Sequence, residues 1–387
     1  MTKHTCFIAL LITGILISQL AGFLGYSPLS EKNAVYAQCK NCPDSSSEKK
    51  DDYVFEKIDP LYLETNVQSL ITIKNEKDII TKRNLLIQYI WSGKGFPDSK
   101  MPDKVEKDTK DIDLKLFDCK EIKNLKSIDK LTVTMDNGLN SIIYFFHPMQ
   151  SNGKLLIYQQ GHRDEYLAEE NTLPVTVEKG YSVITLLMPL MGLNNKPAVD
   201  IPGLGKLKLL THNYLIMLKT ETLSPIKFFM EPVAVALNYA LGNYKFNSVF
   251  MTGISGGGWT TTLYAALDTR ILRSYPTAGT LPTFMRIERD WGDWEQYEPE
   301  LYRIANFLDL YILGSYGDLR KQFQMLNKYD SCCFAGIKYQ IYEKDVKEAV
   351  ARLGKGSFDI YLDDSHKSHK ISEASLKVIL NDIESVK

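Results

Sequence analysis

The sequence predicts an α/β protein with a mostly parallel central sheet flanked by helices. From about residue 131 onward, short apolar runs alternate with stretches of helical composition. Several of these runs are too uniformly apolar to have a solvated face, and strands that are buried on both sides and separated by helices imply a parallel sheet. The expected strands are 131–135, 142–146, 155–158, 181–187, 248–252, 309–313 and 358–362, with another near Tyr275.

The first two expected strands form a hairpin, because they flank Asp136-Asn137-Gly138 and an Asn-Gly pair between apolar runs is a strong hairpin signal. This antiparallel hairpin leads into the parallel sheet. Helices are expected at 77–91, 259–267 and 319–326, and a last helix begins near Ser372, whose hydroxyl can cap it.

The composition indicates a globular chain that has no general affinity for polyanions. Its 387 residues are 44% hydrophobic and 11% aromatic, which is enough for a sizeable core. Lys plus Arg number 46 against 47 for Asp plus Glu, so the formal net charge of -1 offers no field to attract nucleic acid or an anionic membrane. No nucleic-acid partner is expected.

The N-terminus has the features of an export signal. A short basic start precedes an apolar run at 6–24, and small residues at Val35 and Ala37 stand where a signal peptidase needs them, so we expect a signal peptide at 1–37. The run is also long enough to span a bilayer, which leaves an uncleaved anchor open as the one route of membrane attachment. In both cases the folded part is exported, to the periplasm, the cell surface or the medium.

The remaining chain divides by composition. Residues 38–52 are polar and form a linker, 53–130 form an N-terminal accessory segment, and 131–387 form the main domain. An apolar insertion at about 190–230 is longer than an ordinary connection, which is typical of a lid or pocket wall. His212-Asn213 in this insertion and the carboxylates and tryptophans of 290–295 are candidates for substrate contact, although a structural histidine and an ordinary exposed loop explain them as well.

The cysteines do not indicate a metal centre. Six are present, and five remain after removal of a signal peptide, so pairing in an oxidising compartment would leave at least one thiol. Cys39 and Cys42 have a C-x-x-C spacing, but no second Cys or His pair follows at zinc-site distance, so we interpret the pair as a terminal disulfide or as two cysteines without a joint role. Neither a metal nor an organic cofactor is expected.

Ser255 is the candidate nucleophile. It lies in Gly253-Ile254-Ser255-Gly256-Gly257, between the expected strand 248–252 and the expected helix 259–267. A G-x-S-x-G sequence in this context places the serine in a strained turn that exposes its hydroxyl, and the glycines let neighbouring backbone pass close by. The alternative is a glycine-rich turn that only packs a helix onto a strand.

The base must follow the serine, because the chain order in hydrolases of this architecture is serine, acid, histidine. Only His366 and His369 follow Ser255, and both lie in the loop between the last strand and the last helix. We favour His369, which is closer to that helix. His366 is then a solvated loop residue.

The acid that orients the base is expected after the strand 309–313, where Asp318 and Asp330 are both candidates. Asp318 comes directly after that strand, but it could equally form an ion pair with Arg320 at the start of a helix. We favour Asp330, because its aromatic and cysteine-rich surroundings suggest a buried, ordered loop.

The oxyanion of acyl transfer needs hydrogen-bond donors that are fixed in advance. The backbone N–H of Gly256 follows the nucleophile and is the first candidate donor. Gly161 and His162, at the end of the expected strand 155–158, supply the second. A histidine that merely caps a turn is the alternative for His162.

Together, the strand order, Gly253–Gly257, the Gln160-Gly161-His162 loop and His369 resemble the α/β-hydrolase superfamily. The resemblance covers residue 131 to the C-terminus and leaves the segment 53–130 outside. It implies a serine hydrolase that transfers an acyl group to water, with a small-molecule or polymer-linked carboxylic ester as the expected substrate. A peptidase or amidase on the same fold and a non-catalytic binding protein on a hydrolase scaffold remain as alternatives.

Overall fold

The computed structural model describes residues 53–110, 122–163, 171–286 and 290–386. The signal peptide expected at 1–37, the linker expected at 38–52 and the Cys39–Cys42 pair lie outside these ranges. Within them, no helix combines the length and the apolar character that crossing a membrane requires.

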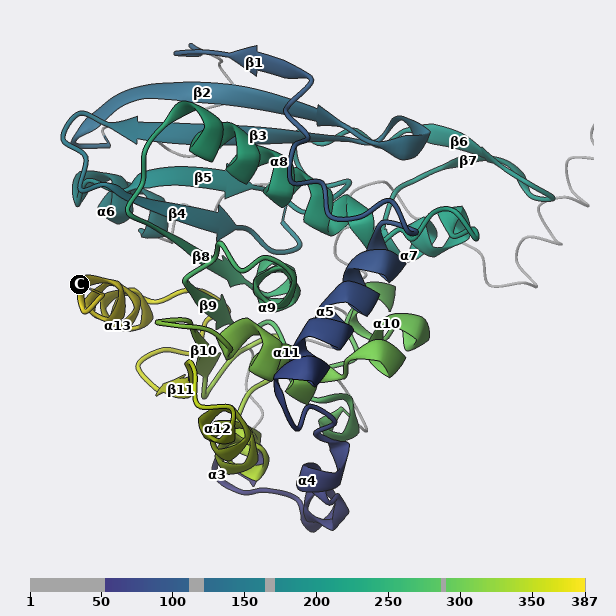
Figure 1. Cartoon of the computed structure of the whole chain (residues 1–387), viewed down its shortest axis with the longest axis vertical. Helices are drawn as coiled ribbons and strands as arrows, with labels where there is room; N and C mark the ends of the chain where they lie inside the picture. The colour runs from purple at the N-terminus through teal and green to yellow at the C-terminus, as the bar shows by residue number, and fades with distance from the viewer. Residues whose placement is uncertain (1–52, 111–121, 164–170, 287–289, 387) are drawn as a thin grey trace, which may run out of the picture. The chain divides into compact units, whose positions relative to one another are not determined.

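A nine-stranded sheet forms the centre of the described structure, in the order β1-β2-β3-β5-β4-β8-β9-β10-β11 (Figure 1). The strands from β5 to β11 in that order pair in parallel, whereas β1, β2 and β3 pair antiparallel with their neighbours. The mostly parallel sheet predicted from the sequence is therefore confirmed. The strands of this sheet are β1 (Lys104–Glu106), β2 (Leu125–Thr134), β3 (Asn140–Pro148), β4 (Lys154–Gln159), β5 (Ser182–Leu186), β8 (Ser248–Ile254), β9 (Arg273–Thr277), β10 (Lys321–Asn327) and β11 (Ser357–Asp363).

The predicted hairpin is confirmed. β2 and β3 pair antiparallel from Thr134 opposite Asn140 onward, and the turn between them contains Asn137 at φ 57° and Gly138 at φ 73°. Asparagine and glycine tolerate this left-handed region better than other residues do, which is why the pair is such a clear signal. β2 begins at Leu125, six residues earlier than the expected strand.

Helices cover both faces of the sheet. In Figure 1, α13 lies on one side of the strands β9 to β11, and α9 and α11 lie on the other. The helices of the described structure are α3 (Tyr53–Glu56), α4 (Val67–Leu70), α5 (Glu76–Ile90), α6 (Thr172–Glu178), α7 (His212–Leu215), α8 (Lys227–Asn243), α9 (Gly256–Leu267), α10 (Pro299–Ile304), α11 (Phe307–Ser315), α12 (Glu343–Arg352) and α13 (Glu373–Glu384). The expected insertion contains the hairpin of β6 (Ala198–Ile201) and β7 (Gly205–Lys208) together with α7.

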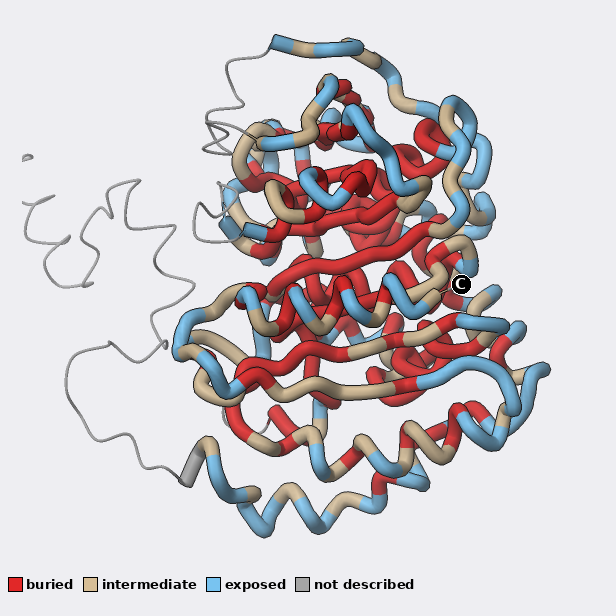
Figure 2. Tube along the Cα trace, turned by 90° about the vertical axis from the view of Figure 1, so that its left-hand side faces the viewer, coloured by how far each residue is buried: buried red, intermediate tan, exposed pale blue. Residues whose placement is uncertain are grey.

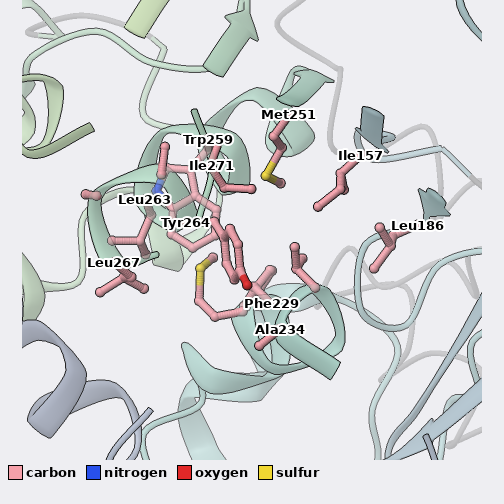
Figure 3. Close-up of a cluster of buried hydrophobic side chains, with 14 of the residues drawn as sticks. Ile157, Leu186, Phe229, Ala234, Met251, Trp259, Leu263, Tyr264, Leu267 and Ile271 are labelled. Atoms are coloured by element: carbon pink, nitrogen blue, oxygen red, sulfur yellow. The ribbon is translucent and has the colours of Figure 1, made fainter. Parts of the chain in front are cut away.

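The helix α9 lies inside the core, and every one of its residues is buried. Figure 3 shows Trp259, Leu263 and Tyr264 of this helix in one apolar cluster with Phe229 of α8 and Met251 of β8. The rings of Trp259 and Phe229 meet edge to face, with centroids 5.2 Å apart. Burial is concentrated along the central strands and decreases toward the outer helices (Figure 2). The helix that follows Ser255 is therefore held on all sides.

The type of secondary structure was predicted wrongly for two elements, because an expected strand is a helix and an expected helix is a strand. Residues 309–313 form part of the helix α11, and 321–327 form the strand β10 where a helix was expected. α11 starts at the N-cap Asn306 and is buried all round, so its apolar residues show no helical period. β10 contains buried glutamines, and Gln324 accepts a hydrogen bond of 2.7 Å from the hydroxyl of Tyr342, so polar positions concealed a buried strand.

The described part of the N-terminal segment packs into the same core as the rest. The helix expected at 77–91 is confirmed as α5, which contacts α9 and α10. Its buried face consists of Ile79, Leu86 and Ile90, whereas Ile80 and Leu85 are exposed. β1 also adds a strand to the edge of the central sheet. No structural boundary therefore separates the described residues 53–110 from the main domain.

Asp309 fixes this segment to α11. The carboxylate is 1% exposed and accepts hydrogen bonds from the backbone N–H of Thr72 at 2.9 Å and from the Thr72 hydroxyl at 2.6 Å. It also accepts a bond from the Ile73 N–H at 3.3 Å and pairs with the ammonium group of Lys82 at 3.3 Å. A single buried charge thus satisfies a cation and several donors that reach it from the N-terminal segment.

Asp309→Ala is expected to lower the free energy of unfolding by about 3 kcal/mol, because it leaves a partly buried ammonium group and partly buried or buried donors without their partner. Urea unfolding of the purified protein measures this change. Asp318→Ala, which removes an exposed aspartate nearby in the sequence, is the matched control and should change stability by less than about 0.5 kcal/mol. Equal effects of the two substitutions would contradict the anchoring role of Asp309.

Candidate active site

Ser255 stands at the sharp turn between β8 and α9. Its backbone has φ 59° and ψ -125°, a conformation that a residue with a side chain rarely adopts. The Ser255 N–H donates to the carbonyl oxygen of Thr277 at 3.0 Å, and the Ser255 carbonyl accepts from Trp259 N–H at 3.0 Å. The strained serine is thus held by β9 on one side and by the helix on the other.

Glycines let neighbouring backbone approach this turn. A Cβ at Gly257 would lie 2.1 Å from the carbonyl oxygen of Gln159 at the end of β4, and a Cβ at Gly253 would lie 2.4 Å from the carbonyl oxygen of Gly257. A Cβ at Gly161 would lie 2.8 Å from Ser255 Cβ. The loop after β4 is therefore in direct contact with the serine.

His369 and Asp330 form a hydrogen-bonded pair. Nδ1 of His369 lies 2.9 Å from Oδ1 and 2.8 Å from Oδ2 of Asp330. Asp330 follows β10 and His369 follows β11, two parallel neighbours of the sheet, which explains why residues 39 positions apart meet. Since an ionised carboxylate only accepts, Nδ1 carries the hydrogen and Nε2 keeps its lone pair.

The loop after β10 stabilises the Asp330 carboxylate. Its Oδ1 accepts from the N–H groups of Cys332 at 2.7 Å and Cys333 at 3.0 Å, and its Oδ2 accepts from the Asn327 side chain at 3.0 Å. Burial opposes ionisation, but the charge and hydrogen bond of His369 and these backbone donors outweigh it and hold the pKa of Asp330 below its ordinary value.

Nε2 of His369 is buried and has no hydrogen-bond partner among the described residues. The structure does not join it to Ser255 by a hydrogen bond, although β8 and β11 place both residues at the carboxyl edge of the same sheet. Hydrogen bonds between a nucleophile and its base are often long in enzymes that have no bound substrate. His369 thus presents a basic nitrogen that is free to accept a proton at this edge.

The other two candidates for the triad lie apart from this pair. Asp318 is exposed and follows a helix instead of a strand, so it does not reach His369. It does not pair with Arg320 either, because the buried Arg320 guanidinium donates to carbonyl oxygens, among them that of Tyr316 at 2.8 Å. Burial lowers the pKa of Arg320 to about 9. His366 is not the solvated residue expected from the sequence, because its side chain is 12% exposed and its Nε2 lies buried 3.5 Å from Oδ2 of Asp363.

The candidate oxyanion donors differ in what they can do. The N–H of Gly256 is the first of α9 and has no partner within the helix. The N–H of Gly161 already donates to the side chain of Gln160 at 3.0 Å, so Gly161 contributes close approach and not a free donor. The His162 N–H takes part in no hydrogen bond within the described chain. Gly256 and His162 are therefore the two donors that the geometry leaves available.

The ring of His162 lies against Gly256. A Cβ at Gly256 would stand 2.6 Å from Cε1 and 2.8 Å from Nδ1 of this ring. On the far side of the ring, Nε2 lies 2.9 Å from His212 Nδ1, 3.1 Å from Asp293 Oδ2 and 3.4 Å from Glu295 Oε1. His212 and the segment 290–295 were separate candidates in the sequence, and the structure brings them together beside the sharp turn at Ser255 between β8 and α9, which we call the elbow.

Opposite charges stabilise this four-residue cluster. Burial disfavours the charged form of His162, but hydrogen bonds and charge from Asp293 and Glu295 outweigh it and raise the pKa of His162 to about 10. Burial also opposes ionisation of Glu295, yet the charges and hydrogen bonds of His212 and His162 lower the pKa of Glu295 to about 2. Only the Asp-x-Glu spacing is local, so nothing in the sequence indicates that the four residues meet. Asp290 lies elsewhere and accepts from the Phe334 N–H at 3.2 Å.

The structure has the α/β-hydrolase fold, as predicted from the sequence. It is similar to acetyl xylan esterase 1 from Thermoanaerobacterium sp. JW/SL YS485, with a TM-score of 0.53 and 14% identity over 86% of this chain and 100% of that one. It is also similar to the methylesterase BT1017, with a TM-score of 0.52 and 12% identity over 93% of this chain and 69% of that one. No protein-family model and no curated protein matches the sequence.

Gly257→Ala is expected to destabilise the protein by about 3 kcal/mol, because the added Cβ meets rigid backbone at the end of β4. Gly242→Ala in α8 is the matched control. Its Cβ would meet only Met101 Cε, at an ordinary 3.6 Å, so the change should be neutral or stabilise by up to about 1 kcal/mol. Chemical denaturation compares both variants, and a Gly257→Ala variant as stable as the wild type would refute the tight approach.

Asp330→Asn is expected to lower stability at neutral pH by about 1–3 kcal/mol, since the amide cannot accept from all of these donors. The folded-state pKa of Asp330 lies below the unfolded value of about 3.9. The ionised form therefore stabilises the protein above that value, and this contribution is lost as the pH falls through the folded-state pKa. Urea midpoints measured from about pH 7 to about pH 3 should converge for wild type and variant. The exposed Asp364→Asn serves as control and should show no such convergence.

Proposed function

We propose that this protein is a serine hydrolase that cleaves a carboxylic ester, with Ser255 as nucleophile, His369 as base and Asp330 as the residue that orients the base. The observation that carries the proposal is the hydrogen bond of His369 Nδ1 to Asp330, which leaves Nε2 as a free base at the edge where the elbow presents Ser255. A turn that only packed a helix onto a strand would not need this pair.

The chemistry follows from these positions. Nε2 of His369 takes the proton of the Ser255 hydroxyl as Oγ attacks the ester carbonyl, and the positive charge that forms on the ring is stabilised by Asp330. The N–H groups of Gly256 and His162 donate to the oxyanion. The C–O bond to the alcohol then breaks, and His369 returns the proton to the leaving oxygen. Water hydrolyses the acyl-enzyme by the same steps, with His369 again as base.

Ester substrates are favoured over amides by the names of the similar structures, an acetyl xylan esterase and a methylesterase. The substrate is accordingly a small-molecule or polymer-linked acyl ester. The apolar insertion at about 190–230 forms a wall beside the site, because its His212 reaches the cluster next to Gly256. The signal-like N-terminus adds export to this proposal.

Labelling with a fluorophosphonate probe tests the nucleophile and the base. The wild type should label, Ser255→Ala should not, and His369→Ala should label about 10²- to 10⁴-fold more slowly, because the serine has lost its general base. His366→Ala removes a histidine of the same loop and is the matched control, which should label at nearly the wild-type rate. Circular dichroism confirms that each variant is folded.

A folded wild type that does not label would overturn the catalytic role and favour a binding protein on this scaffold. If the protein labels, a matched pair of aromatic acetyl ester and acetyl amide distinguishes esterase from amidase. Faster cleavage of the amide would replace the ester proposal, whereas a series of ester chain lengths would otherwise define the acyl group.

A further inference from the structure

Four side-chain atoms converge beside the elbow with the spacing of a tetrahedral metal site. They are Nε2 of His162, Nδ1 of His212, Oδ2 of Asp293 and Oε1 of Glu295, all within 4.8 Å of one another. Zinc bound to nitrogen and oxygen at about 2.0–2.1 Å separates neighbouring ligand atoms by about 3.3–3.4 Å. The separations here of 2.9, 3.0, 3.1, 3.4 and 3.6 Å scatter around that value.

The groups around the cluster aim the ligand atoms inward. Nε2 of His212 lies 2.8 Å from the carbonyl oxygen of Pro189, which can only accept, so Nε2 carries a hydrogen. Nδ1 faces the other ligand atoms, and its lone pair becomes available to a metal ion when the ion displaces the proton that Nδ1 shares with Glu295. A carbonyl behind a histidine is the usual support of a metal-binding imidazole. The Asn213 side chain donates to Oδ1 of Asp293 at 3.2 Å, and Oδ2 faces the two histidines, 3.1 Å from Nε2 of His162 and 3.6 Å from Nδ1 of His212.

Glu295 indicates independently that a ligand belongs here. Its side chain is fully buried, and its Oε2 has no hydrogen-bond partner among the described residues. Buried carboxylate oxygens are normally satisfied, and an orphan oxygen in a native site calls for an ion or water. The Oε1 of the same carboxylate faces both histidines, so a cation between the four residues would bind this carboxylate, and an ion that also reached Oε2 would satisfy the oxygen that the protein leaves without a partner.

We propose that His162, His212, Asp293 and Glu295 bind one Zn²⁺ ion as a structural site. Two imidazoles and two carboxylates suit zinc, whereas Mg²⁺ and Ca²⁺ prefer oxygen ligands in larger number. The two carboxylates neutralise the charge of the ion. Four protein ligands leave no position for substrate, which is the property that separates structural from catalytic zinc sites. No metal was expected from the sequence, in which His162 and His212 lie far from each other and from the Asp293–Glu295 pair.

Such an ion would join three segments that meet beside the candidate active site. His162 belongs to the loop after β4, His212 to the insertion, and Asp293 and Glu295 to the segment before α10. Because the His162 ring rests on Gly256, the ion would fix the loop that carries the second oxyanion donor. The inference rests on the ligand geometry alone and does not depend on hydrolase activity.

Metal binding tests the proposal directly. The full-length protein is treated with EDTA, dialysed, titrated with Zn²⁺ by calorimetry and analysed for bound metal by mass spectrometry. One equivalent of Zn²⁺ is expected, together with a higher melting temperature. His212→Ala and Glu295→Gln should weaken binding by more than the about 10- to 100-fold that the loss of a supporting residue costs. His147→Ala and Glu298→Gln, which alter other largely buried residues of the same types, should still bind one equivalent.

Two results would overturn the site: no stoichiometric Zn²⁺ on folded wild-type protein, or equal affinity in the ligand variants and the controls. In either case the cluster is a charged hydrogen-bond network. If the ligand variants do not fold, Co²⁺ bound to the wild type decides, since only a tetrahedral site gives intense visible absorption bands. Fluorophosphonate labelling is read separately, so a protein that binds zinc but does not label would refute the proposed activity and leave the metal site standing.

Discussion

The close approach of α9 to the end of β4 is the constraint on which the rest of the structure depends. At Gly257 any side chain would collide with the carbonyl oxygen of Gln159, so the helix can start here only on glycine. This approach fixes Ser255 against the loop after β4, at the point where the chain turns from one half of the sheet to the other. The parallel direction of β10 and β11 then brings Asp330 and His369 to the same edge. The close approach thus sets the position of Ser255, and the parallel strands set the position of the His369–Asp330 pair.

Local sequence signals predicted what local physics determines. The Asn137-Gly138 turn, the glycines around Ser255 and the cap at Ser372 each require a particular residue at a particular backbone position, and all three are present in the structure. The apolar pattern predicted the wrong type of secondary structure where complete burial removes the difference between an apolar and a polar face. α11 is apolar on every face, and β10 contains glutamines that are buried and hydrogen-bonded, so apolar content alone assigned both elements wrongly. That error also moved Asp318 to a strand end, a position that in fact belongs to Asp330.

Contacts between segments that are far apart in the chain could not be predicted from the sequence. His162 and His212 are 50 positions apart, and His212 and Glu295 are 83 apart, so nothing in the spacing indicates that they share a cluster. The same is true of the N-terminal segment, whose attachment depends on a buried carboxylate far along the chain. Its helix α5 was predictable, but its buried face was not, because the face is defined by the neighbours α9 and α10.

The anchor at Asp309 has a consequence for how the chain folds. Thr72 and Asp309 are separated by 237 positions, so the first described segment can complete its packing only after most of the polypeptide exists. Until then Ile79, Leu86 and Ile90 have no surface to cover them, and an apolar face that is exposed in a partly folded chain promotes aggregation. Contacts of such long range also slow folding. During synthesis this segment therefore leaves the ribosome before its partner exists, and its safe folding depends on how soon α11 follows.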